Sequence, residues 1–196
     1  MRCTFVRLAG CPLNCTYCDT PQAIPSDSGE WFEMETVLEK VRQFANPLVL
    51  VTGGEPLAQR ACIELLEKLG ELDCIVQLET SGALSIARVP PAIHRIVDIK
   101  TPDSGESKRN NLSNLPLLKT GDEVKFVICS RSDYEWCRDF VREHQLQNQN
   151  IPLLFSAAWG QLDAQKLCQW VLDDRLPVRV QIQLHKVIWG AEASGV

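Results

Sequence analysis

The sequence of 196 residues contains no apolar run that approaches the ~18–20 residues of a membrane-spanning helix. Its first residues, Met1 to Phe5, also lack the apolar stretch and small residues of a secretory signal. Nine cysteines without such a signal point to a reducing compartment, where thiols bind metal or lie buried. We therefore expect a cytoplasmic protein that makes no use of a membrane.

A basic surface is equally missing. The formal net charge is −5, and the lysines and arginines are dispersed, without a basic stripe interleaved with aromatic residues. This distribution argues against a nucleic-acid binder, because such proteins usually present a basic face. We expect a small-molecule substrate instead, with one or two arginines to recognise any negative charge on it.

The chain shows no break in composition, no internal repeat and no low-complexity tract. Its length suits one domain with a substantial core, and 45% of its residues are hydrophobic, as in globular proteins. We therefore expect residues 1–196 to form a single domain.

The most informative segment is a cysteine-rich loop. Cys11, Cys15 and Cys18 share one short turn-rich segment, and no fourth cysteine follows at matching spacing. A structural zinc site requires four protein ligands. An iron–sulfur cubane held by three thiolates instead leaves one iron free to bind a reacting molecule, which gives the missing fourth cysteine a purpose. Two alternatives stay open: a zinc site completed by a distant His or Cys, and three core cysteines that cluster by chance.

Short apolar runs rich in Val, Ile and Leu alternate with segments of helical periodicity. The runs are continuous, which suggests parallel strands covered on both faces. The expected strands are Thr4–Leu8, Leu48–Thr52, Cys74–Glu79, Arg95–Lys100, Glu123–Cys129, Pro152–Phe155 and Val178–Leu184. The apolar stripes of the expected helices start at Met34, Cys62, Trp136 and Leu167. Ser132 begins a capping-box signature before the third helix, and Asp163 is expected to cap the last.

Alternating strands and helices imply right-handed βαβ units and a parallel sheet. Six or seven strands are too few for a complete eight-unit barrel, which takes typically ~250 residues. We expect an α/β fold, a partial, open (β/α) barrel of about six parallel strands. The interval from Cys74 to Lys100 is too short for two strands and a regular helix, so one crossover should be abbreviated. Residues Thr101–Leu115 indicate an irregular loop near the carboxyl ends of the strands.

Candidate ligand-binding residues follow the ends of the expected strands, where parallel α/β folds bind ligands. After the second strand, Gly53 and Gly54 would let the backbone approach a ligand closely, and Glu55 could accept from an amine. A Gly-Gly-Glu-Pro run on its own is equally compatible with a tight turn.

Hydroxyl groups and cations follow the other strands. The third strand ends in residues 79–82, Glu-Thr-Ser-Gly, a run that also suits a capped turn. Lys100 either fixes a carboxylate or ribose, or marks where the fourth strand leaves the core. Arg7, at the end of the first strand, is the arginine best placed for an anionic substrate group. His185 ends the last strand and can reach the barrel mouth, although a lone histidine there is more often structural.

The cysteine spacing, with Tyr17 directly before the third cysteine, resembles the cluster loop of radical S-adenosylmethionine (SAM) enzymes. In those enzymes the open iron binds SAM, and reductive cleavage of SAM gives a 5′-deoxyadenosyl radical. Read in order, the motifs are similar to those of one family in this superfamily, the 7-carboxy-7-deazaguanine synthases. The matching residues span almost the whole chain: 5–8, 10–12, 17–20, 52–56, 79–82, 98–102, 123–127, 154–156 and 183–186.

This resemblance implies a radical SAM lyase that converts 6-carboxy-5,6,7,8-tetrahydropterin to 7-carboxy-7-deazaguanine with loss of ammonia. The reaction belongs to 7-deazapurine (queuosine precursor) biosynthesis, and the family fold is a partial barrel. The implied cofactors are a 4Fe-4S cluster, SAM and Mg2+, and the implied partners are an electron donor such as flavodoxin and a second copy in a homodimer. No acidic or basic side chain is expected to make the first bond cleavage, so no catalytic residue is assigned beyond the cofactors.

The family's functional residues carry over to matching positions of this sequence. Cys11, Cys15 and Cys18 would hold the cluster, and Thr20 would offer its hydroxyl oxygen to Mg2+. Arg7, Thr80 and His185 would bind the pterin and its carboxylate. The SAM site would be lined by Tyr17, Cys18, Asp19, Gly54, Glu55, Gly82, Asp98, Ile99 and Lys100.

One departure from the family lies at the amino terminus. Family members usually begin roughly two dozen residues earlier, with a Leu-Gln-Gly-Glu-Gly-like run that contributes to the substrate pocket. Here Met1 lies almost directly before Phe5. We expect this difference to affect substrate affinity and turnover rather than cluster or SAM binding.

Two other interpretations stay open. One is another small radical SAM enzyme, such as a glycyl-radical activase, which would act on a protein backbone. The other is a non-catalytic iron–sulfur or zinc module. The six cysteines outside the loop are expected to be small buried hydrophobes without ligands: Cys3, Cys62, Cys74, Cys129, Cys137 and Cys168.

Overall fold

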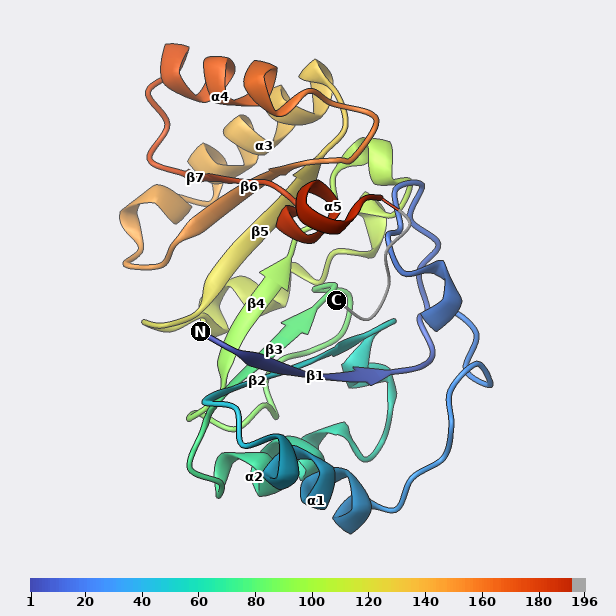
Figure 1. The fold of residues 1–196 in the computed structure, drawn as a ribbon. Coiled ribbons are helices and arrows are strands. Elements are labelled where there is room, and N and C mark those ends of the chain that lie inside the picture. The colour runs from blue at the N-terminus through green and yellow to red at the C-terminus, as the bar shows by residue number, and fades with distance from the viewer. Residues whose placement is uncertain (192–196) are drawn as a thin grey trace.

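Seven strands pair in chain order, all of them parallel, in the computed structural model, which describes residues 1–191. They are β1 (Cys3–Leu8), β2 (Leu48–Gly53), β3 (Ile75–Thr80), β4 (His94–Asp98), β5 (Glu123–Ile128), β6 (Leu153–Ala157) and β7 (Arg179–Gln181). Within the described residues β1 and β7 do not pair with each other, so the curved sheet stays open (Figure 1). The expected partial barrel is confirmed, with seven strands.

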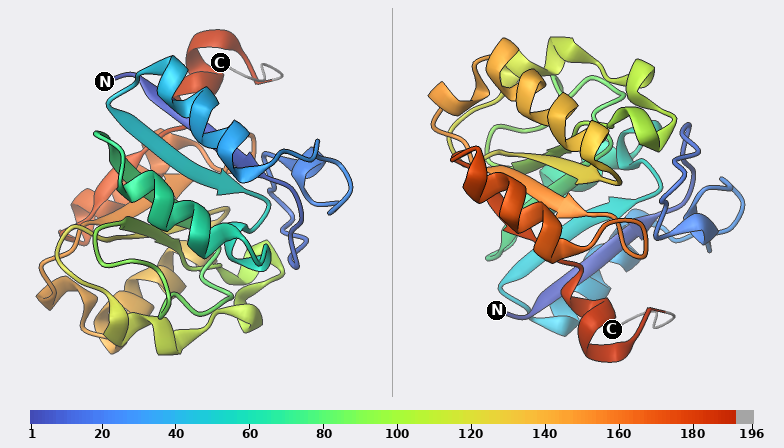
Figure 2. Two further views of the ribbon diagram at one scale, coloured as in Figure 1. Left: turned by 90° about the horizontal axis from the view of Figure 1, so that it is seen from below. Right: turned by 90° about the horizontal axis from the view of Figure 1, so that it is seen from above.

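Four helices lie outside the curve of the sheet (Figures 1 and 2). They are α1 (Met34–Phe44), α2 (Cys62–Gly70), α3 (Arg131–Glu143) and α4 (Ala164–Asp173). A short fifth helix, α5 (Leu184–Trp189), follows β7 and lies toward the open side between β7 and β1. No helix within residues 1–191 is long and apolar enough to cross a membrane.

The hydrophobic core lies between these helices and the convex face of the sheet. Along β5, the fully buried Val124, Phe126 and Ile128 alternate with half-buried residues, among them Lys125. The expectation that the strands are covered on both faces is therefore wrong for β5 and likewise for β3, although all five residues of β6 are buried. The concave face lines an open cavity, and charged side chains on it are paired with one another.

The helix starts follow ordinary capping chemistry. Asp163 caps α4 as expected, because its side chain accepts from the backbone N–H of Gln165. The α3 cap expected at Ser132 is wrong: the extended residue before α3 is Ser130, whose hydroxyl accepts from the backbone N–H of Asp133. Two serines two residues apart both suit the pattern, and the backbone conformation of Ser130 decides between them.

The connections between strands decide what reaches the barrel mouth. The crossover from β3 to β4 contains no helix, as the short interval predicted. Residues 101–117 form three 3₁₀ segments, η3 (Pro102–Ser104), η4 (Ser107–Arg109) and η5 (Leu112–Leu117), instead of an irregular loop. The last strand ends at Gln181, so the placement of His185 on it is wrong, and this residue lies in α5.

A buried ion pair supports the connection between β4 and β5. The fully buried carboxylate of Asp122 accepts from Arg95 Nε (2.9 Å) and from the backbone N–H of Arg95 (3.0 Å). Lys119 adds a backbone hydrogen bond (2.9 Å) and an ammonium contact (3.1 Å). Burial alone would raise the pKa of Asp122, but these hydrogen bonds outweigh it and hold the pKa below its ordinary value of 3.8.

Asp122→Ala is expected to lower the free energy of unfolding by about 3–5 kcal/mol, because it leaves the buried Arg95 cation without its partner. Urea unfolding at pH 7 measures this difference. Because the folded-state pKa is depressed, the stabilisation is complete above pH 3.8 and is lost as the pH falls through the lowered value, so the two proteins should converge in acid. The exposed Asp73→Ala is the control, and an equal loss in both variants would contradict the special role of Asp122.

Candidate functional site

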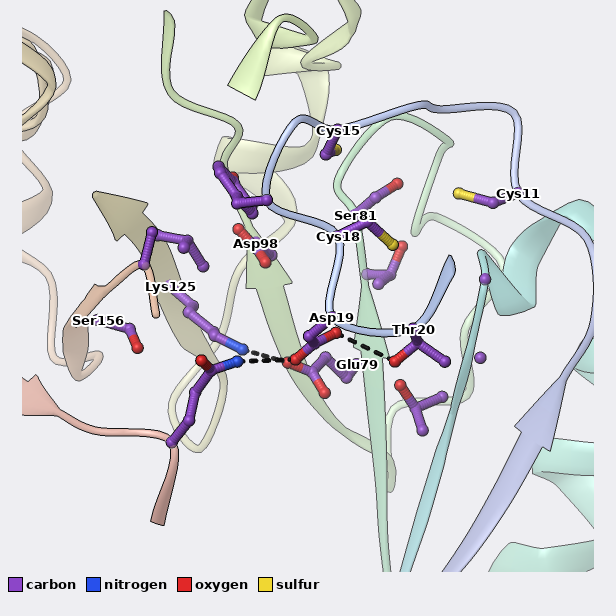
Figure 3. Close-up of a pocket in the computed structure, with 18 of the residues that line it drawn as sticks. Cys11, Cys15, Cys18, Asp19, Thr20, Glu79, Ser81, Asp98, Lys125 and Ser156 are labelled. Atoms are coloured by element: carbon purple, nitrogen blue, oxygen red, sulfur yellow. Dashed lines mark hydrogen bonds and ion pairs between the residues drawn. The ribbon is translucent and has the colours of Figure 1, made fainter. Parts of the chain in front are cut away.

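A cavity of about 410 Å³ opens inside the curve of the sheet, at the carboxyl ends of the strands. Side chains from all seven strands line it. Residues 10–20, which we call the cysteine loop, close one side of it (Figure 3). The strand order therefore gathers segments from the whole chain around one space.

Most of the predicted site residues meet at this cavity. Glu55, Gly82 and Ile99 do not line it, because they lie buried behind the strand ends. The predicted residues that do line it are Arg7, Cys11, Cys15, Tyr17, Cys18, Asp19, Thr20, Gly54, Thr80, Asp98, Lys100 and His185.

The cysteine loop is hydrogen-bonded to residues of η3 and to the residue before η4. The backbone N–H of Thr16 donates to the carbonyl of Ser104 (3.1 Å), and the Thr16 hydroxyl donates to the carbonyl of Asp103 (2.7 Å). The backbone N–H of Asn14 donates to Glu106 Oε1 (2.8 Å). The loop between its first and last cysteine is thus held in place by a segment about ninety residues away in sequence.

Figure 3 shows the three cysteine side chains distributed around one turn of the loop. Cys11 and Cys15 are half-buried and Cys18 is exposed. Burial raises the pKa of the Cys11 thiol and raises that of Cys15 to about 11, so both need a metal to become thiolates at neutral pH.

The thiols of the loop match the ligand set of a cluster. Cys11, Cys15 and Cys18 all line the cavity. A 4Fe-4S cluster can be held by three thiolates, one for each of three irons, which leaves the fourth iron open. Within residues 1–191, no group of three or more His, Cys, Asp or Glu side chains is arranged to hold a single metal ion.

The two glycines after β2 bring this turn against the chain's own backbone. A Cβ on Gly54 would lie 2.5 Å from the carbonyl oxygen of Gly10, and one on Gly53 would lie 2.0 Å from that of Leu8. The close approach allows the backbone N–H of Glu55 to donate to the Gly10 carbonyl (2.8 Å). These glycines therefore position the start of the cysteine loop.

Glu55 is a fully buried carboxylate whose oxygens are occupied by this chain. It accepts from the Thr80 hydroxyl (2.9 Å), from the backbone N–H and hydroxyl of Ser81, and from the backbone N–H of Leu57 (2.9 Å). The carboxylate ties the end of β2 to the end of β3. Gly82 follows directly with φ +72°, a conformation that favours glycine.

Two ion pairs stand on the concave face. Lys100 Nζ lies 3.0 Å from Asp98 Oδ2. Lys125 Nζ lies 2.6 Å from Glu79 Oε1 (Figure 3). The Lys125 charge holds the pKa of the Glu79 carboxyl below its ordinary value, although burial acts in the opposite direction. Burial would lower the pKa of Lys100, but the Asp98 charge outweighs it and the pKa is raised.

Three buried side-chain atoms in the described residues have no hydrogen-bond partner: the Tyr17 hydroxyl, Asp98 Oδ1 and Gln183 Oε1. All three residues line the cavity. Buried polar groups are normally satisfied, so these three atoms are exceptions among the residues around the cavity.

A chain of hydrogen bonds joins the two open edges of the sheet. Arg7 Nη1, on β1, donates to Thr20 Oγ1 (3.4 Å), and Thr20 Oγ1 donates to Asp19 Oδ1 (3.0 Å). On the other side, Gln183 Nε2 donates to Asp19 Oδ2 (2.9 Å). The end of the cysteine loop thus bridges β1 and the segment that follows β7.

Sequence reasoning missed Glu79, Lys125 and Gln183 as site residues. Lys125 gave a signal, because a lysine in the middle of a buried apolar strand needs a polar face to point toward. Glu79 and Gln183 belong to motifs that were recognised, but a motif does not say which of its side chains faces the cavity.

The fold and the cysteine loop define a radical SAM protein. Residues 6–99 match the Radical SAM superfamily. Among solved structures, Streptococcus suis SuiB shares the fold with a TM-score of 0.62 at 14% identity, over 92% of this chain and 49% of SuiB. A structure of anSMEcpe with bound AdoMet gives a TM-score of 0.57 at 17% identity, over 98% of this chain and 68% of that one.

Curated relatives narrow the class to a family. The 7-carboxy-7-deazaguanine synthase of Chlorobaculum tepidum is 41% identical over 99% of this chain and 88% of the relative. That of Koribacter versatilis is 39% identical over 99% of this chain and 91% of the relative. This chain belongs to the 7-carboxy-7-deazaguanine synthase family.

Proposed function

We propose that this protein is a radical SAM carbon–nitrogen lyase that converts 6-carboxy-5,6,7,8-tetrahydropterin to 7-carboxy-7-deazaguanine with loss of ammonia. This places it in 7-deazapurine (queuosine precursor) biosynthesis. The observation that carries the proposal is the near full-length similarity to enzymes named for this product. The cavity, with three thiols on one side and charged side chains around it, supports it.

In this proposal Cys11, Cys15 and Cys18 hold the 4Fe-4S cluster. Together with SAM, the bound cluster supplies a radical that takes hydrogen from the substrate. Tyr17 and Asp98 line the cavity beside the loop, which supports a SAM site there.

The remaining residues assigned to SAM divide into two groups by position. Asp19, Gly54 and Lys100 line the cavity and complete the site. Glu55, Gly82 and Ile99 act from behind it, because they hold the ends of β2, β3 and β4 in place. Their role in SAM binding is therefore one of positioning.

The proposed substrate side is the edge near β1. Arg7 pairs with the pterin carboxylate, since a guanidinium binds a carboxylate through parallel hydrogen bonds. Thr80 and His185 line the same cavity and complete this side. Thr20 offers its hydroxyl oxygen to Mg2+, which prefers oxygen ligands, and Mg2+ would in turn orient the oxygens of the substrate.

The partners follow from the family. We propose that the chain forms one radical SAM domain and that two copies form a homodimer. An electron donor such as flavodoxin would reduce the cluster. All nine cysteines are free thiols in the structure, which supports a reducing compartment such as the cytoplasm.

The test is anaerobic reconstitution with iron and sulfide, then reaction with dithionite and SAM, with and without the carboxy-tetrahydropterin. Mass spectrometry should detect both deoxyadenosine and 7-carboxy-7-deazaguanine, and neither product should form without reductant. Deoxyadenosine alone would mean that the substrate is wrong and would favour another radical SAM enzyme. Zinc in place of iron, with no SAM cleavage, would favour a metal-binding module.

A further inference from the structure

Lys100 lies beyond Asp98, the last residue of β4 that pairs with β5. The side chain of Asn110 takes the place of a neighbouring strand there. Its Oδ1 accepts from the backbone N–H of Lys100 (2.8 Å), and its Nδ2 donates to the carbonyl of the same residue (2.8 Å). We propose that Asn110 is a positioning residue for SAM binding, because it fixes the backbone of Lys100 and thereby the place of the Lys100 ammonium group in the cavity. This role rests on the proposed function, which assigns Lys100 to the SAM site.

The two hydrogen bonds determine the orientation of the Asn110 amide. A backbone N–H only donates and a carbonyl only accepts, so Oδ1 must face the N–H of Lys100 and Nδ2 must face its carbonyl. In an antiparallel sheet, two opposite residues exchange a pair of hydrogen bonds in the same way. Alanine at this position makes neither bond, and aspartate has no donor for the carbonyl. The contact therefore depends on the amide.

The ammonium group of Lys100 has a defined place among the residues of the cavity. Lys100 is buried, and its Nζ lies 3.0 Å from Asp98 Oδ2 and 5.9 Å from the centre of the Tyr17 ring. All three residues line the cavity. A lysine side chain is long and flexible, so its ammonium group keeps one position only when the backbone that carries it is fixed. The Asn110 amide supplies this constraint.

Asn110 is in turn held by the segment that follows β3. The backbone N–H of Asn111 donates to the carbonyl of Gly82 (3.0 Å), and Asn114 Nδ2 donates to the same carbonyl (3.2 Å). Residues 110–114 therefore connect the ends of β3 and β4, the two strands whose crossover contains no helix. At this crossover, asparagine side chains rather than a packed helix position the residues at the strand ends.

A second route from Asn110 to the site must be separated from this one. The segment 101–109, between the two bonded residues, also holds the cysteine loop through Ser104 and Glu106. A change at Asn110 that acted by this route would disturb the cluster first. Iron content therefore has to be measured together with SAM binding.

The experiment is a double-mutant cycle of Asn110→Ala, Lys100→Met and the two together, in protein reconstituted anaerobically with iron and sulfide. Equilibrium dialysis without the pterin measures the Kd for SAM. We expect Asn110→Ala to raise this Kd about tenfold, the usual scale for one weakened hydrogen bond to a charged group. Lys100→Met should raise it at least as much, and the double variant no more than Lys100→Met, because residues that act as one unit are not additive. Iron per chain should match the wild type throughout.

The matched control is Asn46→Ala. Asn46 is also half-buried, and its Nδ2 donates to Thr4 Oγ1 (3.0 Å), but it lies at the amino ends of the strands, away from the cavity. Its replacement should leave the Kd for SAM within about twofold of the wild-type value. If Asn110→Ala does not fold, Asn110→Asp takes its place in the cycle and should also raise the Kd, because it loses the donor to the Lys100 carbonyl.

The outcomes separate this inference from the proposed function. A wild type that binds SAM but forms no 7-carboxy-7-deazaguanine would overturn the proposed function and leave the role of Asn110 to be decided by the cycle. An unchanged Kd in Asn110→Ala, or effects of the two single variants that multiply in the double variant, would overturn the role of Asn110. Loss of iron in Asn110→Ala would place its effect at the cluster and overturn it as well. An unchanged Kd in Lys100→Met would remove Lys100, and Asn110 with it, from the SAM site.

Discussion

Replacement of Cys15 by alanine is expected to abolish cluster assembly and to lower the rate of 7-carboxy-7-deazaguanine formation by more than ~100-fold, since even the loss of an outer-shell contact at a metal site costs about 10–100-fold. The cluster would keep only two of its three protein ligands, Cys11 and Cys18. Iron and sulfide per chain after anaerobic reconstitution, together with the visible absorption of the cluster, measure the first effect. Product formation measures the second.

The matched control is Cys168→Ala. Cys168 is also half-buried, but it lies on α4 and does not line the cavity. Its replacement should leave iron content and turnover unchanged. Retention of a full cluster in Cys15→Ala, or loss of iron in Cys168→Ala, would contradict the assignment of the loop cysteines as the ligands.

Glu55→Ala is expected to lower the free energy of unfolding by about 3–5 kcal/mol, because the buried donors of Thr80, Ser81 and Leu57 lose their shared acceptor. Urea unfolding of the apo protein measures this effect without any cofactor. Without the Glu55 carboxylate, the ends of β2 and β3 lose the hydrogen bonds that join them at the cavity mouth.

Two further variants make the experiment on Glu55 decisive. Glu64→Ala, on the exposed face of α2, controls for the loss of one carboxylate and should change stability by less than about 0.5 kcal/mol. Glu55→Gln keeps the shape of the side chain and should be intermediate. If Glu55→Ala folded as stably as the wild type but bound SAM weakly, the sequence-based prediction of Glu55 as a ligand contact would be right. The structural role of Glu55 in joining β2 to β3 would then be wrong.

The fold followed from local patterns because its elements are adjacent in sequence and in space. Each strand pairs with the next one along the chain, so the order of apolar runs is also the order of the sheet. The stripe of Cys62, Leu65, Leu66 and Leu69 predicted a buried helix face, and all four side chains are buried in α2. The missing helix between β3 and β4 followed from length alone.

The orientation of side chains at strand ends could not be predicted in the same way. Glu55 and Glu79 both lie at the ends of apolar strands, yet Glu55 is a buried brace and Glu79 faces the cavity. The difference depends on which face of the strand each residue occupies and on the partners that the fold brings to it. Lys125 was missed for the same reason, since its partner Glu79 is 46 residues away in sequence.

The end of the last strand shows a second limit. Residues 178–184 alternate between apolar and polar side chains, a pattern that favours a strand, but the strand has only three residues and α5 begins at Leu184. The local pattern therefore did not predict where the strand ends. His185 nevertheless reaches the cavity, because α5 begins directly at its mouth.

The contacts of the cysteine loop also determine when the site can form as the protein folds. Its hydrogen bonds join residues 92 positions apart, at Asn14 and Glu106, and 164 positions apart, at Asp19 and Gln183. Strands that pair with their sequence neighbours form early, whereas contacts that close such long loops carry a greater entropy loss and form late. The cysteine loop precedes most of the sheet in the sequence but is among the last segments to reach its final environment, and a chain that has not yet folded the segment after β7 has no complete binding site.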